Sequence, residues 1–177
     1  MRVRENLQYV YGKTAPEAKG KMIALKTENE ETLFFDFLPL NLGTIRGFHV
    51  RFHLYGVPGA AHYSASCKRI LKGADAIVFV ADSDPAQAKA TLAAWNQLQE
   101  TLAAQGYDFH KMPLTVQLDH REHPKAMPVD ELKRLLGLTD QPVIEAIAPT
   151  GVGVFDSLKS VAKQILTQLK NGAGGGK

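Results

Sequence analysis

Cysteine and long apolar runs are both scarce in this chain of 177 residues. Its single cysteine, Cys67, cannot form an intramolecular disulfide, and no activating base stands near it in the sequence, so we expect a buried, inert thiol. No apolar run approaches the roughly 20 residues that a membrane-spanning helix needs. Residues 1–10 lack the apolar core of a signal peptide, and no lipidation motif closes the other end. These absences predict a cytoplasmic protein without a membrane span.

Clustered charge is also missing. The net charge is only +3, and no group of Lys and Arg is interleaved with aromatic residues, so we expect no nucleic-acid partner. His120 and His123 flank Glu122 in a pattern that could suggest a metal site. The segment runs into Pro124, which keeps the two histidines off a common helix face, and no third ligand is evident. We therefore expect no metal site.

The residues that are present form the pattern of a single globular domain. Hydrophobic residues make up 45% of the chain, and we assign residues 1–170 to one domain and the Gly-rich residues 171–177 to a disordered tail. Residues 32–40 and 48–55 read as a β-hairpin. Apolar runs that favour buried strands and patterns that favour helices then alternate along the chain; the strand runs are 76–81, 114–118 and 143–148, and the helical patterns are 85–104, 129–136 and 155–169. This alternation predicts an α/β fold with a mostly parallel sheet covered by helices on both faces.

Six segments carry a resemblance to a known family. They are LQYVY at 7–11, TLFFDFLPL at 32–40, RFHLY at 51–55, VPG at 57–59, ILKGADAIVFVADS at 70–83 and APTGVGVFDSLK at 148–159. The chain resembles the MglA (mutual gliding) family of bacterial Ras-like GTPases over residues 6–170. The resemblance implies a Ras-like fold.

One part of that family's pattern does not occur in the sequence. The family has a buried strand followed by G-x-x-x-x-G-K-[ST], whose backbone amides and Lys hold the nucleotide phosphates. No run of residues in the 177-residue sequence matches that motif. Residues Arg2 to Glu5 occupy the positions where its last residues would fall. We read residues 1–10 as helical. Because the family's strand lies between the equivalents of 48–55 and 76–81, we expect these two strands either to pair directly or to leave unpaired edges.

The resemblance also identifies the two switch segments. Thr32 keeps the hydroxyl that approaches magnesium, but the Arg expected before it is Glu31, whose charge would repel the developing phosphate charge. Gly59 keeps an N–H that could reach a γ-phosphate, whereas the Gln that orients water is Ala60. We therefore assign no catalytic residue.

The guanine-recognition motif of the family, N-K-x-D, is replaced here by Asp119, His120, Arg121 and Glu122. Glu122 keeps a carboxylate on a longer arm, His120 could stack on a base, and Asp119 cannot donate as Asn does. Ala148, Pro149 and Thr150 match the loop whose backbone reaches the guanine oxygen. We interpret these positions as a degenerate nucleotide site.

The substitutions together predict a pseudo-GTPase that binds protein partners, by resemblance in polarity or gliding motility, with no cofactor. The resemblance implies a partner at the switch face, residues 32–40 and 59–68, of the roadblock type. One alternative is an active GTP-binding switch, with GTP or GDP and Mg²⁺, whose phosphate loop is missing from this gene model. A second alternative is an unstable remnant.

Overall fold

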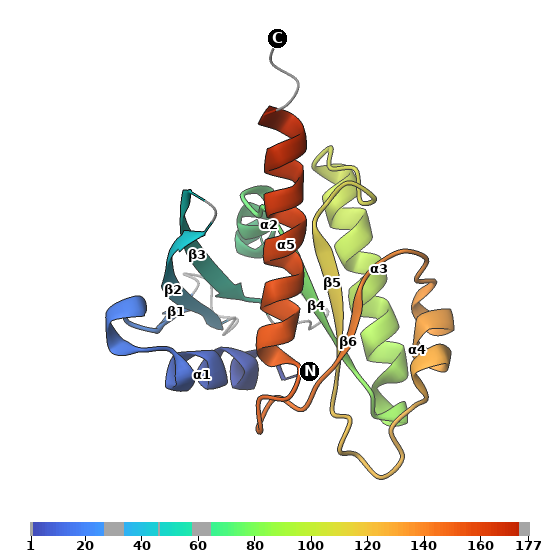
Figure 1. Ribbon diagram of the computed structural model, residues 1–177. Coiled ribbons are helices and arrows are strands. Elements are labelled where there is room, and N and C mark those ends of the chain that lie inside the picture. The colour runs from blue at the N-terminus through green and yellow to red at the C-terminus, as the bar shows by residue number, and fades with distance from the viewer. Residues whose placement is uncertain (1, 27–33, 46, 58–64, 174–177) are drawn as a thin grey trace.

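Two small sheets and five helices make up the fold in the computed structural model, which describes residues 2–26, 34–45, 47–57 and 65–173 (Figure 1). The elements in chain order are α1 (Val3–Lys13), β1 (Ile23–Lys26), β2 (Phe34–Ile45), β3 (Phe48–Gly56), α2 (Ala65–Lys72), β4 (Ile77–Asp82), α3 (Ala88–Ala104), β5 (Leu114–Asp119), α4 (Val129–Leu136), β6 (Val143–Glu145) and α5 (Val154–Ala173). Short 3₁₀ turns cover Pro16–Ala18 and Pro85–Gln87.

The parallel sheet has the order β4-β5-β6 and confirms the α/β class. All six residues of β5 are buried, yet they alternate in character. Leu114, Val116 and Leu118 join the main core with side chains of α3 and α4, including Trp95 and Leu132. Thr115 faces the other way, where its hydroxyl donates to Ser160 of α5. Helices therefore cover both faces, and the second face is polar, which the apolar reading of this strand did not predict.

The antiparallel sheet has the order β1-β2-β3 and contains the expected hairpin. The predicted connection at 41–47 is shorter than expected, because β2 runs on to Ile45 and shifts its register between Asn41 and Thr44. Leu38 and Leu40 point inward and form a second core with Val10 and Val154. The edge strand β1 was not predicted.

The two sheets are separate, so residues 48–55 and 76–81 do not pair directly, which was the first of the two outcomes expected for them. In the described ranges, β3 pairs with β2 alone and β4 pairs with β5 alone. Strands β3 and β4 therefore each have one edge without a strand partner in those ranges. This is the second of the two outcomes expected from the sequence. Helix α1 packs beside the end of β3, where a Cβ added to Gly56 would meet Leu7 at 2.6 Å.

The helical prediction for residues 1–10 is confirmed from Val3 onward by α1, whose buried face contains Leu7 and Val10, while Met1 lies outside the described residues. Helix α4 matches its predicted bounds, 129–136, for local reasons. Pro128 precedes it, Asp130 and Glu131 lie in its first turn, and Gly137 ends it in the left-handed conformation at φ 62°. Helix α5 packs against β4 and β5, and in the view of Figure 1 it is drawn in front of the strands.

Two of the predictions from the sequence concern Cys67 and the C-terminal residues. Cys67 is buried in α2, in agreement with the prediction. Helix α5 runs to Ala173, so residues 171–173 are helical rather than part of a disordered tail, and residues 174–177 lie outside the described ranges. None of the helices in those ranges combines the length and apolar character needed to cross a bilayer.

Candidate functional site

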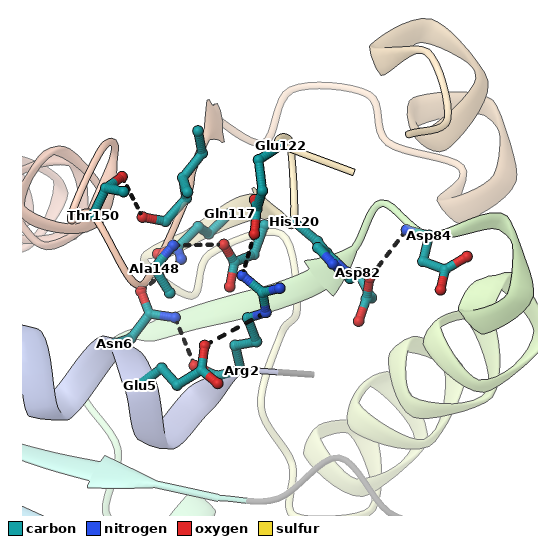
Figure 2. A network of polar contacts seen from close by, with 12 residues as sticks. Arg2, Glu5, Asn6, Asp82, Asp84, Gln117, His120, Glu122, Ala148 and Thr150 are labelled. Carbon is teal, nitrogen blue, oxygen red and sulfur yellow. Dashed lines mark hydrogen bonds and ion pairs between the residues drawn. The ribbon is translucent and has the colours of Figure 1, made fainter. Parts of the chain in front are cut away.

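The candidate site lies at the carboxyl ends of β4 and β5, where ligand sites of parallel α/β sheets form (Figure 2). Asp82 ends β4 and Asp119 ends β5, and the two residues are partners in the strand register. Both are buried. The strands therefore place two carboxyl groups at the same edge of the sheet.

Asp119 is almost completely buried, with 1% of its surface exposed. Its Oδ1 accepts a 2.9 Å hydrogen bond from the backbone N–H of Ala148, whereas its Oδ2 is buried and has no hydrogen-bond partner within the described structure. Burial raises the pKa of the Asp119 carboxyl and outweighs the hydrogen bond from Ala148. The main contact of this side chain thus joins the end of β5 to the loop after β6.

His120 follows Asp119 with φ at 68°, the left-handed region that a non-glycine residue seldom occupies. Its ring Nδ1 lies 3.0 Å from Asp82 Oδ1, which also accepts a hydrogen bond from the backbone N–H of Asp84 at 3.0 Å. Burial acts to raise the pKa of Asp82, but the Asp84 amide and His120 outweigh it, and the pKa is lowered. The backbone of His120 therefore directs the imidazole toward Asp82.

Glu122 forms an ion pair with the guanidinium of Arg2, the residue that precedes α1. Arg2 Nε also lies 3.4 Å from Glu5. Burial acts to raise the pKa of Glu122, but its own backbone amide and Arg2 prevail and lower it. The pair is partly exposed and contributes at most about 1 kcal/mol to stability. It nevertheless places a cation of this chain on the carboxylate that matches the base-recognition Asp.

Arg121 contacts groups other than those that Glu122 contacts. Its Nε donates to Glu145 of β6 at 2.8 Å, and its Nη1 donates to the carbonyl oxygen of Met127 at 2.6 Å. These contacts hold the loop after β5 against β6. No pattern in the sequence predicted this role of Arg121.

The three residues of the loop after β6 differ in exposure. Ala148 is buried beneath Asp119, while Pro149 and Thr150 are exposed. Thr150 Oγ1 donates to the carbonyl oxygen of Ile147 at 3.2 Å, a contact within the loop.

Gly151 has φ at 83° and lies against Tyr9 of α1, where an added Cβ would approach the ring Cζ to 1.7 Å. This close contact ties the loop to α1.

Sequence reasoning missed a second link between α1 and the sheet. Gln117, in the middle of β5, donates a 2.7 Å hydrogen bond to Asn6 Oδ1, and both side chains are buried. Asn6 Nδ2 donates in turn to the carbonyl oxygen of Arg2 at 2.9 Å. The one signal for this link in the sequence was Gln117 itself, a polar residue within a run predicted to be a buried strand.

The structure thus brings together Asp119, His120, Glu122 and Ala148, with Pro149 and Thr150 at the rim. Thr32 and Gly59 lie outside the described residues, as do Glu31 and Ala60. In the part of the chain that is described, no group of three or more His, Cys, Asp and Glu side chains could hold a metal ion. Both acids of the predicted base-recognition positions have contacts within the chain: Asp119 with Ala148 and Glu122 with Arg2.

Comparison with known proteins identifies the family of this chain. No protein-family model matches the chain. The mutual gliding-motility protein MglA of Myxococcus xanthus (strain DK1622) is 55% identical to it over 167 residues, which cover 94% of this chain and 86% of that protein. Identity of this extent, over a Ras-like α/β fold, shows that the chain belongs to the MglA family of bacterial Ras-like small GTPases.

Proposed function

We propose that this chain is a pseudo-GTPase of the MglA family that binds protein partners independently of nucleotide, in cell polarity or gliding motility. The observation that carries the proposal is the ion pair between Arg2 and Glu122. Glu122 stands where the family's Asp accepts two hydrogen bonds from guanine. A base entering this site would have to displace Arg2 before it reached the carboxylate.

The switch positions support the same conclusion from a different part of the sequence. Glu31 replaces the Arg that would stabilise transition-state charge, and Ala60 replaces the Gln that would orient water. Both substitutions lie in the interior of the chain, so they hold wherever the chain begins. Asp119 is a third interior change, at the position of the motif's Asn.

Direct measurement of nucleotide binding tests this proposal. Calorimetric titration of the 177-residue chain with GDP and a non-hydrolysable GTP analogue, in Mg²⁺, should give a Kd weaker than about 1 µM, or about −8 kcal/mol. Losing two hydrogen bonds to a charged group removes roughly 3 to 6 kcal/mol. A Mg²⁺-dependent Kd below about 1 µM would overturn the proposal. A cooperative thermal melt of the same sample is the control, because an unstable remnant would show none.

Partner recognition provides a second test. The proposed partner is a roadblock-type regulator that contacts the switch face. Without a phosphate to bias the switches, one conformation should be recognised at all times. Pull-downs from the source cell should therefore recover the partner equally with and without the GTP analogue, whereas recovery only with the analogue would indicate a working switch.

The alternative, an active switch whose phosphate loop is missing from this gene model, also has an observation in its favour. The match covers only 86% of the Myxococcus protein, so that relative contains residues without a counterpart in this sequence. An in-frame strand and G-x-x-x-x-G-K-[ST] upstream of Met1 in the genome would support it. The longer chain would then have to pass the same binding measurement.

A further inference from the structure

Asp119 is a buried acid, and one of its two carboxyl oxygens has no hydrogen-bond partner in the part of the chain that the structure describes. Oδ1 receives the N–H of Ala148, but Oδ2 is buried and receives no hydrogen bond within the described residues. With 1% of its surface exposed, the residue cannot rely on bulk water to stabilise a charge. A buried carboxylate with an unsatisfied oxygen is costly unless the group is neutral.

The charges around Asp119 do not remove this cost. Its register partner on β4, Asp82, carries a carboxylate that His120 and the Asp84 amide keep ionised. Glu122, in the same loop, is a second acid, and its carboxylate forms an ion pair with Arg2. Arg2 favours a charged Asp119, while Glu122 opposes it.

The packing on the side of β6 and its following loop adds no net charge. On β6, Glu145 pairs with Arg121. Residues 146–151, the loop that covers Asp119, contain no charged side chain. The backbone amides of Ala148 and His120 favour the ionised form, but burial outweighs them, and the pKa of Asp119 is raised.

We propose that Asp119 remains a neutral carboxylic acid in the folded chain at pH values at which an exposed aspartate is already ionised, with Oδ1 accepting from Ala148 and Oδ2 available as an O–H donor at the edge of the parallel sheet. In this form Asp119 has the donor and acceptor pattern of the asparagine that the family motif carries at this position. It is thus a positioning residue that holds the loop after β6 to the end of β5. The inference goes beyond the proposed function, because it concerns the folded chain without nucleotide.

A carbon-13 NMR titration of the wild-type chain tests the protonation state directly. The Asp119 carboxyl resonance is followed from about pH 3 to about pH 8, and its midpoint should lie above the ordinary aspartate value of about 3.9. A midpoint at or below that value would overturn the inference. The titration is made without nucleotide, so its result is independent of whether GTP binds.

A matched pair of acid-to-amide variants gives a thermodynamic test. A raised pKa contributes stability that is fully present below the ordinary aspartate pKa and is lost as pH rises through the folded-state pKa. Asp119→Asn lacks this loss, so its Tm relative to wild type should increase as pH rises from about 4 to about 7. Asp140→Asn makes the same chemical change in the exposed loop between α4 and β6 and should not reproduce this trend. A Tm difference for Asp119→Asn that stays constant or decreases with pH would overturn the inference, and if that variant does not fold, the wild-type titration decides.

Discussion

Gln117 donates a 2.7 Å hydrogen bond to Asn6, and this contact fastens α1 to the middle of the parallel sheet. The two residues are 111 positions apart in the sequence and both are buried. In the described ranges the two sheets share no strand pairing, so α1, which packs on β2 and β3, links the halves of the molecule. Arg2 and Tyr9, on the same helix or next to it, add contacts to Glu122 and Gly151.

Asn6→Ala should therefore be destabilising. The substitution leaves the buried amide of Gln117 without its acceptor, which costs about 1 to 3 kcal/mol of unfolding free energy. Urea unfolding measures the loss, and Asn96→Ala, at an exposed position of α3, is the control. Equal stability of the two variants would show that another group or water satisfies Gln117.

Gly151→Ala should cost more than Gly137→Ala. Both glycines have positive φ, 83° and 62°, so either alanine pays about 1 to 2 kcal/mol for the left-handed conformation. Only at Gly151 would the new Cβ also collide with the Tyr9 ring, since nothing lies within 4 Å at Gly137. Thermal or urea unfolding compares them, and equal losses would mean that Tyr9 moves aside freely.

Asp82 should give a pH dependence of opposite sign to that of Asp119. Its pKa is lowered in the folded chain, because the Asp84 amide and His120 outweigh the effect of burial. A lowered pKa contributes stability that is present above the unfolded value and is lost as pH falls through the folded value. The Tm advantage of wild type over Asp82→Asn should therefore shrink as pH falls below about 4. Asp75→Asn, at an exposed residue before β4, controls for the loss of one acid, and a pH-independent advantage would contradict the assignment.

Restoring the two switch residues should not restore hydrolysis. Glu31→Arg combined with Ala60→Gln returns the groups that stabilise the transition state, but these groups act only on a substrate that is bound and positioned. Phosphate release from GTP by the double variant should equal that of wild type, with matching thermal melts as the control for folding. A measurable rate would reveal a phosphate site in this chain.

Local patterns were enough to predict most helices and strands. Helix α4 has a proline before it, acids in its first turn and a glycine at its end, and its bounds were predicted without error. The hairpin of β2 and β3 followed from alternating apolar residues, but the extension of β2 through Gly43 did not, because glycine is typical of a turn. Strand β1 has only four residues, too short a run for a periodic signal.

For the candidate site, too, some features follow from the sequence and others only from the tertiary structure. The resemblance of the sequence to the family placed Asp119, His120, Glu122 and Ala148 in one predicted site, and the residue types alone determined which chemical groups its switch positions lack. Only the tertiary structure decided how these groups are used: Arg2 pairs with Glu122, His120 turns to Asp82, and Gln117 reaches Asn6. The physical reason is distance along the chain. Local propensity acts over a few residues, whereas burial and hydrogen bonding of a polar side chain depend on partners that only folding brings within about 3 Å.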